Sequence, residues 1–353
     1  MAMKVHTTSS FKIQIIGAGG IVNDAHLPAY NIAGYPVAGI FDIDKAKASV
    51  LQKKFNLPKV YGSIEEMVSN SDHSTIFDVA VPGSEIFATL QKLPNHAVVL
   101  IQKPMGNNLD EAIAIRSLCR EKQIIAGMNF QLRYAPFILK ARELISDGTI
   151  GELCDLEINI NVYTPWHLWT FLNEAPRVEI LYHSIHYIDL IRSFIGNPKS
   201  IYARTLKHPQ VTNLASVKSN ILMDYNEFVR AHIHTNHNHN FGDKHQHAFI
   251  KFEGSKGAIR VELGLLKNYP EGDEDVFEWV EIKEGEQAKW QKLDIDGSWF
   301  PHAFIGSMSE MIKVMNDRNY VPDNSIEDCI HTMACVESAY QSSKSGAVSV
   351  VKV

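Results

Sequence analysis

The chain has 353 residues, 45% of them hydrophobic and 21% charged, which is the composition of a globular protein with room for two domains. Its net charge of −6 excludes the broad basic surface that nucleic-acid-binding proteins use. No apolar run approaches the roughly 20 residues of a membrane-spanning helix, so we expect no membrane partner. The four cysteines lack CxxC spacing and are expected as reduced thiols, which favours a cytoplasmic location.

Short apolar strands alternate with helices in the first part of the chain. We expect strands at 11–16, 37–41, 77–81, 97–101 and 124–128, and helices that end near Asn31 or cover 45–55 and 109–122. This alternation is typical of a parallel sheet covered on both faces. Such sheets bind ligands at the carboxyl ends of their strands, so the residues that follow each strand are the candidates for a site.

The second part of the chain is rich in strands joined by short polar turns. After a helix near 134–147, we expect strands at 154–162, 200–206, 215–223, 228–235, 247–252 and 258–263. They predict a large antiparallel sheet with helices 179–195, 300–318 and 325–343 over one face. We place the domains at 1–130 and 131–353. The uncovered sheet face is expected to be apolar and to form the interface of a homodimer or homotetramer.

A glycine turn follows the first strand and opens a helix. Such a turn lets backbone N–H groups approach a pyrophosphate, and its residues are Gly17, Ala18, Gly19, Gly20 and Ile21. The third glycine of the GxGxxG pattern is replaced by Val22. Asp42 ends the second strand, near the position where an acidic residue contacts ribose hydroxyls and repels a 2′-phosphate. We therefore expect NAD rather than NADP; the alternative is that Asp42 only caps the helix that starts near Asp44.

Four segments carry a family resemblance. They read IIGAGGIVNDAHLPAY, VVLIQKPMG, FQLRYAPF with the later ELISDGTIGEL, and EILYHSIHYIDLIRSFIGNP. The first has a His-Leu-Pro after the glycine turn. The segment VVLIQKPMG is similar to a Glu-Lys-Pro motif with Gln102 in place of Glu, and the last segment is similar to a DxGxHxxD helix. Together they resemble the glucose–fructose oxidoreductase / inositol dehydrogenase / MocA (Gfo/Idh/MocA) family over nearly the whole chain.

The resemblance implies an N-terminal Rossmann domain and a C-terminal α+β domain with a large, mostly antiparallel open sheet. Members of the family are mostly NAD(P)-dependent oxidoreductases that act on sugars, cyclitols and polyols, and their second sheet commonly forms the oligomer interface. The family's lysine falls on Lys103 and its catalytic histidine on His186. Pro104 is often cis in relatives. Near the cofactor we also expect Gln102 and Pro82, which follow two strand ends.

Oxidation of a secondary alcohol needs a hydride acceptor, a base for the hydroxyl proton and a group that holds the developing oxyanion. A histidine suits the second task and a lysine ammonium the third. Tyr182 occupies the position where the family has an Asp, and on one helix face with His186 it can donate from its hydroxyl. The alternatives are a solvated Lys103 and a core His186 bonded to Asp189; Asp189 is expected to be structural.

Six histidines lie between residues 232 and 247, in a pattern HxHxxHxH. Alternate strand residues share a face, so a metal site is one interpretation, and imidazoles that line a polyol pocket or an interface are the other. We expect no metal. Arg133 and Tyr134 are hinge, packing or substrate-contact residues. Aromatic rings can stack on a sugar and imidazoles can line a polyol pocket. We therefore assign the substrate contacts to Trp166, His183, His237 and His239.

The predicted function is an NAD-dependent dehydrogenase that passes hydride between the nicotinamide and a secondary alcohol of a sugar-like or polyol substrate. One alternative keeps the NAD bound and uses transient oxidation for epimerisation, elimination or glycoside cleavage. A second alternative is a non-catalytic regulator of the same fold that senses cofactor and sugar.

Overall fold

The computed structural model describes residues 10–269 and 272–346, which divide into two compact units. The first unit joins the described residues up to Pro136 to Asp296–Met333, and the second holds the remaining described residues. The predicted outer limits at residues 1 and 353 lie outside the described residues. Our second domain of 131–353 differs from this division at 131–136 and over 296–333, both of which belong to the first unit.

The first unit is built on a five-stranded parallel sheet of order β2-β1-β3-β4-β5. Its strands are almost continuously apolar because helices cover both faces. Since the chain leaves β1 for β2 on one side and for β3 on the other, the carboxyl ends of these strands form a topological switch point. The bounds are β1 Lys12–Ile16, β2 Val37–Phe41, β3 Thr75–Val79, β4 Val98–Gln102 and β5 Ile125–Asn129.

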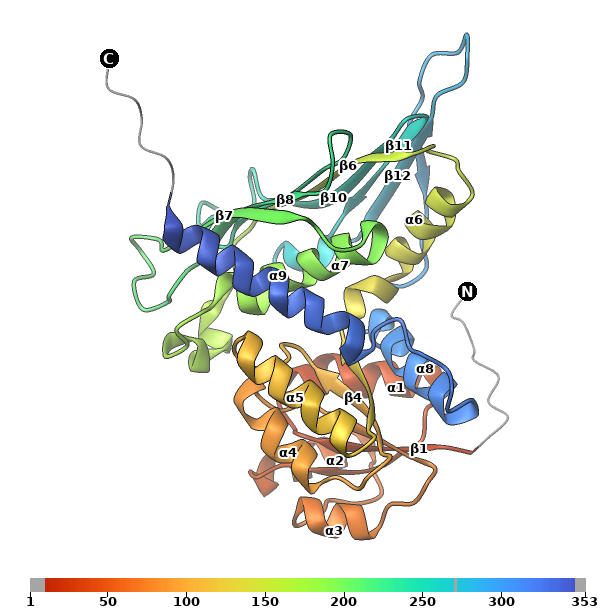
Figure 1. The fold of residues 1–353 in the computed structure, drawn as a ribbon, viewed down its shortest axis with the longest axis vertical. Helices are drawn as coiled ribbons and strands as arrows, with labels where there is room; N and C mark the ends of the chain where they lie inside the picture. The colour runs from red at the N-terminus through yellow and green to blue at the C-terminus, as the bar shows by residue number, and fades with distance from the viewer. Residues whose placement is uncertain (1–9, 270–271, 347–353) are drawn as a thin grey trace. The chain divides into compact units, whose positions relative to one another are not determined.

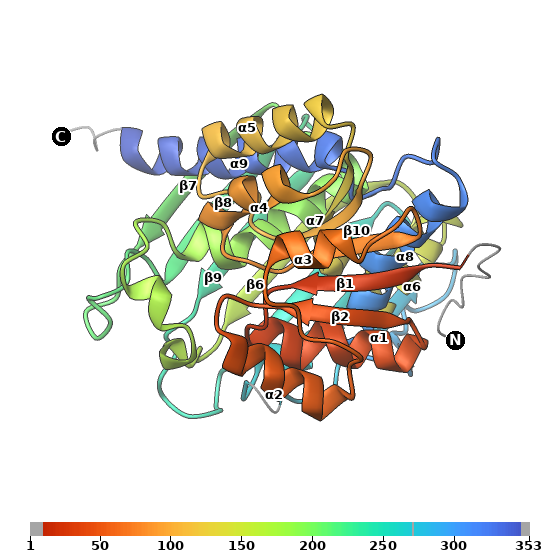
Figure 2. The ribbon, with the colours of Figure 1, turned by 90° about the horizontal axis from the view of Figure 1, so that it is seen from below.

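Helices cover this sheet on two sides (Figure 2). On one side lie α1 (Leu27–Ala33) and α2 (Lys45–Phe55), and on the other α3 (Ile64–Ser69), α4 (Ile86–Lys92) and α5 (Leu109–Glu121). The helix α8 (His302–Asn316) packs against α1, β4 and β5.

The place of α8 corrects our expectation that the helix at 300–318 covers the second sheet. Its buried Phe304, Met308 and Met311 share one core with Ile13 and Leu100 of the first sheet. The helical pattern predicts an apolar face but not the sheet that it covers. In this fold that face is buried against β4 and β5.

The second unit contains an eight-stranded sheet of order β13-β12-β11-β10-β6-β9-β8-β7. Neighbouring strands are antiparallel except for β6 and β9, which run parallel. This confirms the predicted fold class of a Rossmann-type sheet plus a mostly antiparallel sheet. The bounds are β6 Leu153–Asn161, β7 Ser200–Leu206, β8 Lys218–Asp224, β9 Arg230–Asn236, β10 His247–Gly254, β11 Gly257–Glu262, β12 Val276–Glu281 and β13 Gln291–Leu293.

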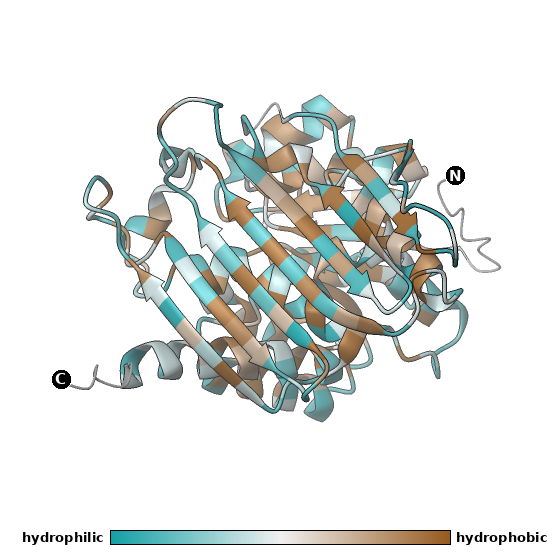
Figure 3. Ribbon diagram, turned by 90° about the horizontal axis from the view of Figure 1, so that it is seen from above, coloured by the Kyte–Doolittle hydropathy of each residue, from teal (hydrophilic) through white to brown (hydrophobic). Residues whose placement is uncertain are grey.

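One face of this sheet is lined by α6 (Pro136–Ser146), α7 (Ile185–Ile195) and the C-terminal part of α9 (Ile326–Ser345) (Figure 1). Figure 3 shows the opposite face, where polar and apolar positions alternate. Half-buried Glu157 and Lys251 lie on this face, as does exposed Tyr202. The face is therefore mixed rather than apolar as expected, because strand alternation turns most apolar side chains toward the helices. Across the described ranges, no helix is both long and apolar enough to span a bilayer.

Candidate functional site

Two glycines of the turn after β1 have different structural roles. Gly17 has φ +110°, and a Cβ there would collide with the carbonyl oxygen of Ala80, so the fold requires glycine. Gly19 is exposed, and a Cβ there would meet no atom within 4 Å. Gly20 and Ile21 follow at the start of the helical segment, where first-turn N–H groups lack intrahelical acceptors. The turn thus leaves open backbone of the kind that a pyrophosphate contacts, which fits a dinucleotide.

Asp42 is held beside this turn. Its Oδ2 accepts from the Ala18 N–H at 2.6 Å, and its Oδ1 accepts from the Asp44 N–H at 2.8 Å. The cap of α2 is Asp44, whose side chain accepts from the N–H groups of Ala46 and Lys47. Asp42 is therefore not the helix cap, and its oriented carboxylate retains lone pairs for ribose hydroxyls.

Lys103 follows the end of β4, the strand next to β3. The side-chain oxygen of buried Gln102 accepts from the Lys103 N–H at 2.9 Å, and the Lys103–Pro104 peptide bond is cis. Burial lowers the pKa of Lys103 to about 8. The neighbouring strand β3 leads to exposed Pro82. Lys103 is half-buried, and its ammonium gives up its proton more readily than usual.

A buried polar network that sequence reasoning missed lies under these strand ends. His26 Nδ1 is 2.7 Å from Asp78 Oδ2, and the Tyr30 hydroxyl donates to the same oxygen at 2.7 Å. The amide nitrogens of Asn129 and Gln102 lie 3.3 and 3.5 Å from His26 Nε2. Because amide N–H groups face Nε2, the proton of His26 sits on Nδ1, toward Asp78. The available signal was an Asp inside the apolar strand TIFDV.

In the second unit, His186 is a buried residue of α7. A π-helical turn, Ile180–Ser184, precedes this helix and contains the half-buried Tyr182 and His183. Single π-turns inside helices are frequent at functional sites.

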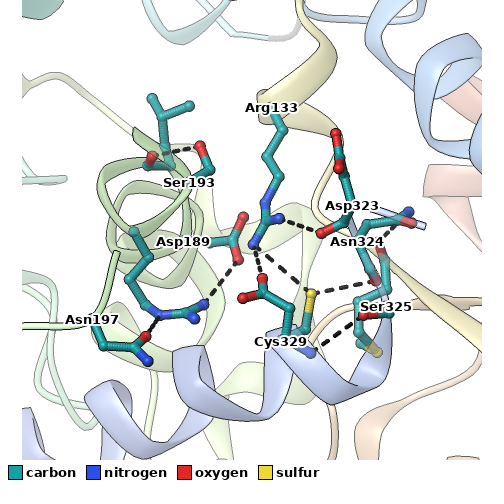
Figure 4. A network of polar contacts seen from close by, with 12 residues as sticks. Arg133, Asp189, Ser193, Asn197, Asp323, Asn324, Ser325 and Cys329 are labelled. Carbon is teal, nitrogen blue, oxygen red and sulfur yellow. Dashed lines mark hydrogen bonds and ion pairs between the residues drawn. The ribbon is translucent and has the colours of Figure 1, made fainter. Parts of the chain in front are cut away.

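Arg133 and Asp189 lie in structural networks (Figure 4). In the first unit, Arg133 donates to the Asp323 carbonyl at 2.7 Å and to Asp328 Oδ2 at 2.8 Å, which ties it to the first turn of α9 and to the segment before that helix. In the second unit, Asp189 and Arg192 form a buried pair at 4.0 Å. These contacts favour a packing role for Arg133 and agree with a structural Asp189.

Three of the four predicted substrate contacts come together in the second unit. The ring centroid of His183 is 5.0 Å from that of Trp166 and 4.5 Å from that of His237, and Trp166 and His237 are 5.8 Å apart. A residue that we did not predict, Glu179, has its Oε1 3.5 Å from His237 Nε2. His239 lies elsewhere, with Nδ1 3.1 Å from the Asn161 amide.

Two other strand histidines contact polar residues of neighbouring strands. His234 Nδ1 is 2.8 Å from Asn220 Oδ1, and burial followed by the neighbouring His247 and His232 lowers its pKa. His232 Nε2 lies 3.7 Å from Glu157. Among the residues that the structure describes, no three His, Cys, Asp or Glu side chains converge as metal ligands.

Two family models match the chain. One, described as the oxidoreductase family with an NAD-binding Rossmann fold, covers residues 11–130, and the other, described as the GFO/IDH/MocA C-terminal domain, covers residues 138–260.

Similar proteins span the chain at low identity. An uncharacterized protein of Saccharomyces cerevisiae, YMR315W, is 24% identical over 95% of this chain and 96% of its own. Glucose-6-phosphate 3-dehydrogenase of Bacillus subtilis is 29% identical over 42% of this chain and 41% of its own. An oxidoreductase from Agrobacterium radiobacter, solved with NAD+, L-tartaric acid and magnesium, shares the fold at a TM-score of 0.78 and 20% identity over 96% of this chain and 98% of that one.

Together the two matched domains cover more than half of the chain, in the order that the sequence resemblance implies. The chain belongs to the Gfo/Idh/MocA family of oxidoreductases.

Proposed function

We propose that this chain is a cytoplasmic, homo-oligomeric, NAD-dependent dehydrogenase that acts on a secondary alcohol of a sugar or polyol. The observation that carries the cofactor assignment is the glycine turn, in which open backbone at Gly19 adjoins an Asp42 carboxylate held by two backbone N–H groups. The substrate class is supported by relatives whose names include glucose-6-phosphate 3-dehydrogenase and 1,5-anhydro-D-fructose reductase.

The roles of the protein groups follow from the chemistry. When bound, the nicotinamide exchanges hydride with the alcohol carbon. His186 takes the hydroxyl proton on a ring nitrogen, a step that contributes roughly 10²–10⁴-fold in general acid–base catalysis. The Lys103 ammonium hydrogen-bonds the developing oxyanion. Tyr182 donates from its hydroxyl where the family has Asp, and the Trp166 and His183 rings contact the substrate.

A matched pair of glycine variants tests the cofactor site. Gly19→Ala should leave the melting temperature unchanged and weaken NAD binding, because the new methyl group enters the space above the open backbone. Gly17→Ala should destabilise the protein itself, since its Cβ meets backbone and φ is positive. Unchanged NAD affinity in Gly19→Ala, measured by calorimetry, would contradict the assignment.

Asp42 decides between the two cofactors. The wild type should bind NAD more tightly than NADP, and Asp42→Ser should narrow that preference because it removes the charge that repels a 2′-phosphate. Tighter NADP binding by the wild type would reverse this part of the proposal.

A polyol and sugar panel, read by NADH absorbance, tests the reaction. For an alcohol that the protein oxidises, His186→Ala should lower kcat by roughly 10²–10⁴-fold and should change the affinity for NAD by less than twofold. Reduction of bound NAD with no net release of NADH would favour epimerisation, elimination or glycoside cleavage by transient oxidation. Binding of NAD and sugar without any reduction would favour a regulator; the super-repressor mutant of Gal80p from Saccharomyces cerevisiae shares the fold at a TM-score of 0.77 and 16% identity.

A further inference from the structure

A buried carboxylate–imidazole pair lies behind the aromatic cluster of the second unit. The side chains of Glu179 and His237 are 0% and 1% exposed, and Glu179 Oε1 lies 3.5 Å from His237 Nε2. The Ser184 hydroxyl donates to Oε1 at 2.7 Å, and Thr164 Oγ1 is 2.9 Å from His237 Nδ1. A carboxylate removed from water to this extent needs a cation or a proton.

The surroundings favour an ionised Glu179. Burial raises the pKa of this carboxyl, but His237, Ser219 and Ser184 together bring that pKa below its ordinary value. The imidazole of His237 lies between this carboxylate and Thr164 Oγ1, so each of its ring nitrogens faces a polar group of the same buried network.

Other titratable groups face the same pair. They are Tyr187 of α7, Tyr340 of α9 and His234 of β9, each of which interacts electrostatically with Glu179. Burial raises the pKa of both phenols, so neither carries charge near neutral pH. His237 is therefore the titratable ring that directly faces this carboxylate, with a ring nitrogen 3.5 Å away.

The pair supports an outer layer of rings. His237 lies against His183 at a centroid distance of 4.5 Å and against Trp166 at 5.8 Å. His183 and Trp166 are half-buried, whereas His237 and Glu179 are fully buried. Within the described part of the chain, the Trp166 Nε1–H is buried and has no hydrogen-bond acceptor.

We propose that Glu179 and His237 are positioning residues whose buried contact fixes the His183 and Trp166 rings for a sugar or polyol. The family's carboxylate position is Tyr182 in this chain, and Glu179 supplies a carboxylate three residues earlier, before the π-turn. The inference rests on the proposed function for the identity of the ligand, while the ring placement is a property of the free protein.

Nuclear magnetic resonance tests the pair in the absence of substrate. In the wild type, nuclear Overhauser contacts should connect the His183 and His237 rings, and Glu179→Gln, which keeps the shape and removes the charge, should weaken them. His237→Asn assigns the signals. Ring contacts that Glu179→Gln leaves unchanged would overturn the proposal.

The matched control is Glu157→Gln. Glu157 faces His232 at 3.7 Å on the open face of the same sheet, where the two side chains are 18% and 27% exposed and water screens them. This variant should leave the His237 signals and the His183–His237 contacts as they are in the wild type. An equal effect from both variants would show a general response of the sheet and would count against the pair.

Steady-state kinetics distinguish a failure of the positioning role from a failure of the proposed function. For the alcohol found in the panel, Glu179→Gln should raise KM by about tenfold or more, as expected for the loss of a hydrogen bond to a charged group, with the KM for NAD within twofold. An unchanged KM for the alcohol would reject the positioning role. A protein that turns over no alcohol would reject the proposed function, whereas the resonance experiment still decides the ring placement.

Discussion

Replacing His26 with leucine removes the centre of the buried network in the first unit. His26 and Asp78 are both fully buried and lie 2.7 Å apart, and the Tyr30 hydroxyl is the second donor to Asp78 Oδ2. Burial, followed by the charge of Asp78, raises the pKa of Tyr30 well above its ordinary value, so this hydroxyl keeps its proton and remains a donor. The leucine variant therefore leaves Asp78 buried with one of its two donors.

The magnitude follows from this arrangement. His26→Leu removes a hydrogen-bond donor from a buried carboxylate, which costs about 1.5–3 kcal/mol, and it takes the acceptor from the amide N–H groups of Asn129 and Gln102, which costs about 1–3 kcal/mol more. We therefore expect this variant to lower the free energy of unfolding of the first unit by about 3–6 kcal/mol. Tyr30→Phe removes one hydrogen bond to a charged group and should cost about 1.5–3 kcal/mol. Because both side chains contact the same carboxylate oxygen, the two effects should not add in the double variant.

The assay must report on the first unit alone. Of the five tryptophans in the sequence, Trp299 falls in the first unit, and it is 4% exposed. Urea denaturation of protein labelled with 5-fluorotryptophan, followed at the Trp299 resonance and assigned with Trp299→Phe, gives the midpoint for this unit. A loss below about 1 kcal/mol in His26→Leu would refute the reasoning, because the network would then contribute no more than one ordinary hydrogen bond.

Three further predictions concern other parts of the chain. Since burial lowers the pKa of Lys103 to about 8, its ammonium is lost as pH rises through that value, so kcat/KM for alcohol oxidation should fall above pH 8; Lys103→Arg, which keeps its charge, should remove this decline. Arg133→Met should destabilise the first unit by about 1–3 kcal/mol and Asp328→Asn by less than about 1 kcal/mol, because Arg133 is buried and Asp328 is 42% exposed; equal losses in denaturation would contradict this. Light scattering at micromolar concentration should give a mass well above 39.7 kDa, and a monomer mass would reject the proposed oligomer.

Buried strands were the most predictable elements of the fold. β2 begins and ends where its apolar run predicts, at Val37 and Phe41, and β1 ends at the expected Ile16. Strands covered on both faces need apolar residues at every position, which gives a signal that no other short segment imitates. Partly exposed strands lack it: β12 (Val276–Glu281) was missed because Glu278 and Glu281 interrupt its apolar pattern.

Helical periodicity predicted helices but not their neighbours. The apolar face at 300–318 was visible in the sequence, yet nothing local distinguishes a face that covers β4 from one that covers β9. The π-turn Ile180–Ser184 was also beyond reach, because it depends on how the segment before α7 packs and not on its composition. For the same reason the i, i+4 relation assumed between Tyr182 and His186 could not be checked without coordinates.

Within the candidate site, motifs located single residues and coordinates located their partners. Lys103 and His186 were named because short motifs contain them, whereas Asp78 and Glu179 carry no motif. Both are ionisable residues that end up fully buried, at 0% exposure, in or beside apolar segments. Because burying a lone carboxylate is costly, such a residue predicts a partner, here His26 for one and His237 for the other. The identity of that partner follows from the fold, since 52 and 58 residues separate the two pairs along the chain.

The replacement of Glu by Gln102 in the Lys-Pro motif is consistent with this network. The Gln102 oxygen accepts from the Lys103 N–H, which turns the amide nitrogen toward His26 Nε2. Since Nδ1 donates to Asp78, Nε2 of a neutral His26 is an acceptor, and an amide N–H suits it. A glutamate at position 102 has no hydrogen to offer, so a close contact with His26 would require a second proton on the imidazole. Gln102 and the His26–Asp78 pair therefore form one feature, which joins the backbone of Lys103 to the buried core of the first unit.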